Sequence, residues 1–153
     1  MAFVHLHNHT EYSMLDGATK IKDMVRRAAD LDMPAVAITD HGVMCGIPEL
    51  CDACDAVEKE TGKRVKPIYG CEIYFTEDPE VGTKNKSRLY HMLLLAKNNV
   101  GYHNLVHLVS ESHVDNFYYK PRTTFDMLQR YSEGVIAASA CIAGIALHRR
   151  ARS

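Results

Sequence analysis

Short apolar runs alternate with helical patterns along the chain. Five runs rich in aliphatic, β-branched and aromatic residues predict strands at 2–7, 34–40, 66–76, 90–98 and 134–141. Between them, apolar residues recur every three or four positions. This spacing predicts amphipathic helices at 20–31, 46–62, about 101–113 and 124–134, the last capped by Thr123 or Thr124. The charged stretch 77–88, which holds Pro and Gly, is predicted to be a loop.

The order of these elements predicts an α/β fold. Strands that alternate with helices are typical of parallel strands joined by crossover helices, and the near-continuous apolar strands agree with burial on both faces. We therefore expect about five parallel-type strands in one domain, since no internal repeat or linker interrupts the 153 residues. In such folds the catalytic and ligand-binding residues lie at the carboxyl ends of the strands.

The composition excludes some classes of protein but does not by itself indicate a function. The hydrophobic share of 46% and the charged share of 24% are ordinary for a globular domain, and a net charge of −1 argues against a polybasic nucleic-acid binder. No apolar run reaches the roughly 18 residues that span a bilayer, so no membrane partner is expected. The five cysteines, in a chain without a recognisable leader, indicate free thiols in a reducing cytoplasm.

Residues with metal-binding side chains stand at the ends of all five predicted strands. Histidines at i and i+2 of a strand share one face, so His7 and His9 can converge on one ion. The side chains at these strand ends are of the types that bind zinc, manganese or iron. Asp40 is expected to orient His41 from outside the ligand shell. The strand-end residues are His7, His9, Asp40, His41, Glu72, His91 and Cys141.

Each of these residues also has an ordinary structural interpretation. A single histidine at a strand end is more often a hydrogen-bonded structural residue, Glu72 can pair with a lysine, and Cys141 can fill a core. Their shared placement at the strand ends favours a metal site. Two other pairs of residues are not interpreted as metal ligands. Cys51 and Cys54 lie on the apolar face of a predicted helix, and His103 and His107 lie on the solvated face of another.

Several segments resemble the N-terminal PHP domain of bacterial DNA polymerase III alpha subunits. They are HLHNHTEYSMLDGA, AITDHGVMCGIPE, IYGCEIYF, YHMLLLAKNNVGYHNL and FYYKPRTTFDML, and the match runs from about Phe3 to Gly144. The resemblance implies an incomplete, distorted (βα)7 barrel with up to three divalent ions, zinc or manganese, at the strand ends. The implied metal ligands are His7, His9, Asp16, His41, Glu72, His91 and Cys141, and Arg122 would steady a phosphate or brace the cluster.

The resemblance also implies a function in DNA replication. An intact site would be a metal-dependent phosphoesterase of the 3′–5′ proofreading type, with Asp40 and Arg122 as supporting catalytic residues. Its partners would be a DNA 3′ end, the rest of the polymerase subunit and, in some branches, a separate proofreading exonuclease. Two alternatives stay open: a free-standing phosphatase for a small monoester such as histidinol phosphate, and a non-catalytic interaction module.

The resemblance stops near the end of the chain. Residues 1–144 are interpreted as the N-terminal part of a PHP domain, and 145–153 (IALHRRARS) as a basic tail outside the family pattern, produced by truncation or frameshift. The family's last Asp-x-His ligand pair is then absent. We therefore expect the isolated chain to bind fewer ions than an intact site and to be weak or inactive as an enzyme.

Overall fold

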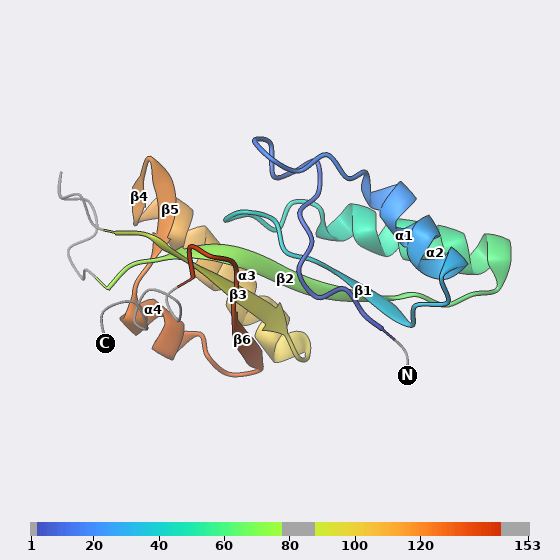
Figure 1. Ribbon diagram of the computed structural model, residues 1–153. Helices are drawn as coiled ribbons and strands as arrows, with labels where there is room; N and C mark the ends of the chain where they lie inside the picture. Colours follow the sequence, from blue (N-terminus) through green and yellow to red (C-terminus); the bar gives the residue numbers. More distant parts are fainter. Residues whose placement is uncertain (1–2, 78–87, 145–153) are drawn as a thin grey trace.

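A long strand, β2 (Lys66–Phe75), lies at the centre of the sheet in the computed structural model, which describes residues 3–77 and 88–144 (Figure 1). The predicted tail at 145–153 and most of the predicted loop at 77–88 lie outside the described residues, so the domain division at residue 144 stays a prediction. The other elements are α1 (Ile21–Asp30), β1 (Ala35–Ile38), α2 (Ile47–Thr61), β3 (Tyr90–Ala96), α3 (Asn99–Val114), β4 (Phe117–Tyr118), β5 (Lys120–Thr123), α4 (Phe125–Arg130) and β6 (Val135–Ser139). All of them except β4 and β5, which were not predicted, follow the predicted runs within a few residues.

The sheet is mixed, so the expectation of parallel strands throughout was wrong. Along one edge, β2 pairs in parallel first with β1 and then with β5. Its other edge pairs antiparallel with β3, which in turn pairs antiparallel with β6. The physical reason lies in the sequence between β2 and β3: residues 77–88 show no apolar helical periodicity, and such a sequence favours an antiparallel return of the chain over a parallel crossover. In the described residues the sheet is open, with β6 at one end of the strand order.

The first predicted strand is reduced to a single bridge. His5 pairs in parallel with Val36, and its carbonyl accepts the Ala37 N–H at 3.0 Å. After this bridge, the side chain of Asn8 replaces the backbone as the hydrogen-bond partner of β1, because its amide donates to the Ala37 carbonyl at 2.9 Å. The segment 5–9 thus lies beside β1 without continuing as a strand, and its residues His7 and His9 reach Glu72 of β2.

Two packed clusters hold the sheet in place. The helices α1 and α2 enclose one core with β1, which includes Ile21, Ile38 and Leu50. The helix α3 covers the face of β2 that carries Cys71 and Ile73. Because side chains alternate along a strand, Glu72 and Tyr74 point to the opposite face. This alternation delivers a carboxylate to the side of the sheet that α3 does not cover.

Local signals in the sequence explain where the helices begin and end. Gly62 ends α2 with a φ of 72°, a left-handed conformation that favours glycine. The Asn98 side chain accepts the Gly101 N–H and caps α3, and Thr124, one of the two predicted residues, caps α4. No helix in the described ranges combines the length and the apolar character needed to cross a bilayer.

Candidate metal centre

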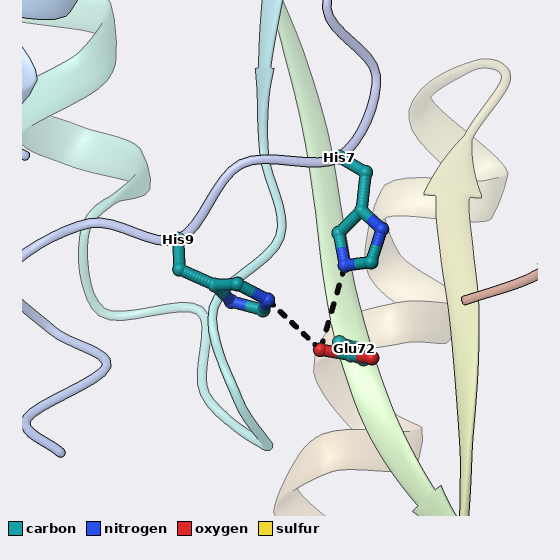
Figure 2. Close-up of side chains that lie close together, drawn as sticks. All are labelled: His7, His9 and Glu72. Atoms are coloured by element: carbon teal, nitrogen blue, oxygen red, sulfur yellow. Dashed lines mark ion pairs between the residues drawn. The ribbon is translucent and has the colours of Figure 1, made fainter. Parts of the chain in front are cut away.

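The carboxylate of Glu72 is the centre of the site. This side chain is 1% exposed, yet four histidine nitrogens approach it. Its Oε2 atom lies 3.5 Å from His7 Nε2, 3.0 Å from His9 Nε2 and 3.1 Å from His41 Nδ1. Its Oε1 atom lies 3.0 Å from His91 Nδ1. Figure 2 shows how His7 and His9 point at the carboxylate from one stretch of chain that crosses above β2.

These side chains form two overlapping groups with metal-ligand geometry. His7, His9 and Glu72 place three ligand atoms within 4.8 Å of one another, and so do His41, Glu72 and His91. Glu72 belongs to both groups, which therefore share one carboxylate.

The hydrogen bonds of His9 fix which of its nitrogens faces Glu72. Ser13 Oγ donates its only proton to Asp40 Oδ1 at 2.7 Å, because an ionised carboxylate can only accept. At the 3.4 Å contact with His9 Nδ1, the hydroxyl oxygen therefore accepts and the imidazole donates. The proton stays on Nδ1, and the lone pair of Nε2 points at the Glu72 carboxylate.

His41 shows the same arrangement with the opposite nitrogen. Its Nε2 atom lies 3.0 Å from Asp16 Oδ2 and donates to that carboxylate. The Nδ1 atom then faces Glu72 Oε2. A histidine that one carboxylate orients, while its other ring nitrogen faces the cluster, is the usual arrangement of a metal ligand.

The buried atoms without hydrogen bonds support the same interpretation. Within the described residues, His7 Nε2, His41 Nδ1 and both Glu72 oxygens are buried and make no hydrogen bond. Unpaired buried polar atoms are rare in proteins because each one costs free energy. All four are atoms of the kind that divalent cations bind. The residues present therefore fit a divalent metal.

Burial and neighbouring charges keep His9 in the form that binds metal. Burial lowers the pKa of His9, as does the nearby His41, while the negative charge of Glu72 acts in the opposite direction. The net shift is downward, so the imidazole is neutral at neutral pH. The hydrogen bond from His41 lowers the pKa of Asp16, which keeps that carboxylate ionised.

The structure brings Cys141 and Asp16 to the edge of the cluster. Cys141 Sγ lies 3.4 Å from His91 Nδ1, and both Cys141 and the Asp16 side chain are exposed. Asp16 contacts the nitrogen of His41 that points away from Glu72. All seven predicted ligands thus gather at one end of the sheet. Their individual roles as ligands stay predictions.

Among the described residues, Asp40 is connected to the His41 backbone through Ser13 and makes no hydrogen bond to the His41 ring. Its carboxylate accepts from Thr10 N at 2.6 Å, from Thr10 Oγ1 at 2.8 Å and from Ser13 Oγ at 2.7 Å. Ser13 Oγ in turn accepts the backbone N–H of His41 at 3.1 Å. Asp40 therefore positions both histidines through the segment after His9. Thr10 and Ser13 were not singled out from the sequence, although both follow the histidine motif closely.

Two further residues beside the cluster were also missed. Tyr74 stands two positions after Glu72 on the same face of β2, and its ring centroid lies 6.0 Å from that of His41 and 5.2 Å from that of His91. Lys120 Nζ donates to the Tyr74 hydroxyl at 3.0 Å. Arg122 pairs with Tyr74 through the backbone and lies over the Tyr118 ring, 5% exposed. The predicted phosphate contact of Arg122 stays a prediction.

The excluded patterns lie away from the cluster. His103 and His107 are exposed on α3, and Cys54 is buried in the core beside α1. Burial raises the pKa of Cys54 to about 11, as expected of an inert thiol. A different histidine of α3 is structural: His113 Nε2 donates to the Gly42 carbonyl at 2.8 Å and secures the turn after His41.

Comparison with known proteins agrees with this geometry. The family model described as "PHP domain" matches residues 5–149. A DNA polymerase III subunit alpha from Helicobacter pylori is 44% identical over 143 residues, which are 94% of this chain and 11% of the relative. The same subunit from Treponema pallidum is 40% identical over 147 residues, again 94% of this chain and 12% of the relative. The chain thus spans about a ninth of the length of these curated relatives.

The similarity to solved structures is weaker. An amidohydrolase from Chromobacterium violaceum, solved with bound sulfate and no metal, aligns with a TM-score of 0.49 at 20% identity. The alignment covers 72% of this chain and 33% of that chain.

Proposed function

The chain belongs to the PHP domain family, and on that premise we propose that it carries a metal-dependent phosphoesterase site that acts on the 3′ end of DNA within a polymerase. One observation carries the proposal: ring nitrogens of four histidines lie 3.0–3.5 Å from the two buried oxygens of Glu72. We infer that the polymerase is a DNA polymerase III, because the chain is similar to the alpha subunits of that enzyme. Since the chain spans about 11% of such a relative, the activity and partners of a whole subunit belong to the proposal.

The residues of the chain would hold two divalent ions, zinc or manganese, side by side. His7 and His9 would hold one ion, His41 and His91 the other, with Glu72 shared between them. When bound, such ions supply a nucleophilic hydroxide at neutral pH and stabilise charge on phosphoryl oxygens. A side-chain nucleophile is then not required.

The protein around the ions would orient the ligands and exclude water from one side. Asp40, Ser13 and Asp16 hold the histidine rings in the tautomers that present lone pairs to the cluster. Glu72 is buried against the sheet, whereas His7 and His9 keep 29% and 23% of their side chains exposed. A substrate would therefore approach from the histidine side. The cation of Lys120 contacts Tyr74, whose ring neighbours His41 and His91.

A metal-binding and hydrolysis experiment on the 153-residue chain tests this function. The chain is dialysed against zinc or manganese, and its metal content is measured by mass spectrometry. Hydrolysis is then followed with protein in excess over two substrates, a 3′-labelled single-stranded DNA and p-nitrophenyl phosphate. Glu72→Gln removes the shared carboxylate, and Glu58→Gln changes an exposed glutamate of α2 as a matched control.

We expect up to two ions per chain and slow, metal-dependent release of 3′ nucleotides. Both should be lost in Glu72→Gln and kept in Glu58→Gln. A chain that takes up no metal, or hydrolysis that persists in Glu72→Gln, would contradict the proposal. Metal uptake without any hydrolysis would support a non-catalytic module instead, and faster hydrolysis of the monoester would support a small-molecule phosphatase.

A further inference from the structure

An exposed aromatic hairpin stands next to the candidate metal centre. The strands β4 and β5 pair antiparallel and are joined by Tyr119 alone. Tyr119 has a φ of 59° and is 84% exposed. A left-handed backbone is rare for an aromatic residue and costs free energy, and so does an aromatic ring held in water. Neither feature is explained by packing.

The rings and cations of the hairpin are ordered relative to one another. The Tyr118 and Tyr119 rings meet edge to face, with centroids 4.6 Å apart. The Arg122 guanidinium lies 5.0 Å from the centroid of the Tyr118 ring. Phe117, at the start of the hairpin, is 54% exposed. The hairpin thus presents flat aromatic surface to solvent, with the half-buried Lys120 and the buried Arg122 beside it.

Direct contacts connect this hairpin to the metal centre. A Cβ atom on Gly42, the residue after His41, would lie only 2.7 Å from Pro121 Cγ, so β5 packs closely against this turn. Lys120 Nζ lies 4.1 Å from the centroid of Tyr74, the ring that stacks on His41. In Figure 1 the hairpin stands beside the end of β2 that pairs with β5.

We propose that the β4–β5 hairpin binds the 3′-terminal nucleotides of single-stranded DNA, with Tyr119 and Phe117 stacked on bases and Lys120 facing a phosphate. The proposal rests on the proposed function, because it supplies the substrate-binding surface for that site. Single-stranded DNA alternates flat bases with phosphates, and exposed rings beside cations are the surface that recognises it. Asp115 lies two residues before the hairpin and reduces its net positive charge. We therefore expect stacking to contribute more affinity than charge.

Fluorescence anisotropy with a 5′-fluorescein-labelled oligothymidylate of about eight nucleotides tests the proposal. Chelator is present, so that binding is measured without metal and without cleavage. Tyr119→Gly is the informative variant, because glycine removes the ring and tolerates the left-handed backbone. Tyr119→Phe keeps the ring, and Phe125→Ala removes an exposed ring from α4 as a matched control.

We expect the Kd of Tyr119→Gly to rise roughly ten-fold, while its thermal stability is unchanged or higher. Tyr119→Phe and Phe125→Ala should bind as the unmodified chain does. Lys120→Gln should lower the slope of log K against log salt by about 0.7, whereas Lys59→Gln on α2 should leave that slope unchanged.

Equal affinity in the unmodified chain and Tyr119→Gly would overturn the proposal. Binding of the oligonucleotide no tighter than that of thymidine monophosphate would overturn it as well. Failure of the proposed function would appear elsewhere, as missing metal uptake or as hydrolysis that does not depend on Glu72. The two proposals are therefore tested by separate measurements.

Discussion

Glu72 Oε1 and His91 Nδ1 lie 3.0 Å apart, although Glu72 stands near the end of β2 and His91 near the beginning of β3. They meet because β3 runs antiparallel to β2, so that its first residues lie beside the last ones of β2. His91 therefore reaches the site from the amino end of its strand. The other histidines of the cluster arrive from segments that run parallel to β2.

Replacing one histidine from each group should remove one ion at a time. His7→Ala deletes a ligand of the first group, and His91→Ala deletes one of the second. Each variant should therefore bind about one ion fewer than the unmodified chain, whereas Glu72→Gln should lose both. Metal content after dialysis measures the difference.

His103→Ala, which changes an exposed histidine of α3, is the matched control and should load as the unmodified chain does. If His7→Ala and His91→Ala each abolished all metal binding, the two groups would act as one site. That result would contradict the division into two ions.

Metal binding should stabilise the fold measurably. An ion that binds only the folded chain adds about 4 kcal/mol when its concentration is about 1,000 times its Kd. For a domain of this size, that corresponds to a rise in Tm of roughly 10 °C. Thermal unfolding followed by circular dichroism, with manganese or with chelator, checks the shift.

The same measurement on Glu72→Gln separates metal binding from packing. In chelator this variant should be at least as stable as the unmodified chain, because it replaces a buried carboxylate that faces lone pairs by a neutral amide. Manganese should then leave its Tm unchanged. A large loss of stability in chelator would show that Glu72 stabilises the metal-free fold.

That the candidate residues would lie close together was predictable from the sequence, but the direction of each strand was not. The spacing of His7 and His9, and the placement of Glu72 in an apolar run, indicated a shared site. Local patterns do not report which strands pair, so β3 was assigned the wrong direction. His91 joins the site because β3 runs antiparallel to β2, which places the first residues of β3 beside the last residues of β2.

Residues that act through hydrogen bonds were the hardest to predict. Ser13 resembles any loop serine, and its role depends on a contact with Asp40, which is 27 positions away in sequence. The sequence indicated only that Tyr74 is an aromatic residue of a strand, and not that it lies beside the histidines. The β4–β5 hairpin was not predicted because its strands are short, and because a tyrosine, Tyr119, stands at the turn where glycine or asparagine is usual.

Ser13→Ala should weaken metal binding without removing any ligand. The variant leaves Asp40 Oδ1 without one donor and His41 N–H without its acceptor. We expect a loss of about 1–3 kcal/mol in the free energy of unfolding and a metal affinity lower by roughly 10- to 100-fold. Competition with a chromophoric chelator gives the affinity. Ser110→Ala, on the exposed face of α3, is the control, and equal affinity in both variants would contradict the role of Ser13.

Gly17→Ala should move Asp16 and Ser13 away from His41 while the core stays intact. A Cβ atom at Gly17 would lie 1.8 Å from the Thr10 carbonyl oxygen, and the Gly17 N–H donates to the Ser13 carbonyl at 2.7 Å. The segment between Thr10 and Gly17 must therefore open to admit the methyl group, with a cost of about 1–3 kcal/mol in the free energy of unfolding.

Gly62→Ala provides the control for this glycine substitution. It places alanine at a φ of 72° at the end of α2, where nothing lies within 4 Å of the added Cβ atom. Its cost of roughly 1 kcal/mol arises from the backbone conformation alone. Both variants should thus unfold at lower urea concentrations, but only Gly17→Ala should also lose metal affinity in the chelator competition. If both variants kept the affinity of the unmodified chain, the segment after His9 would have no part in holding the metal centre.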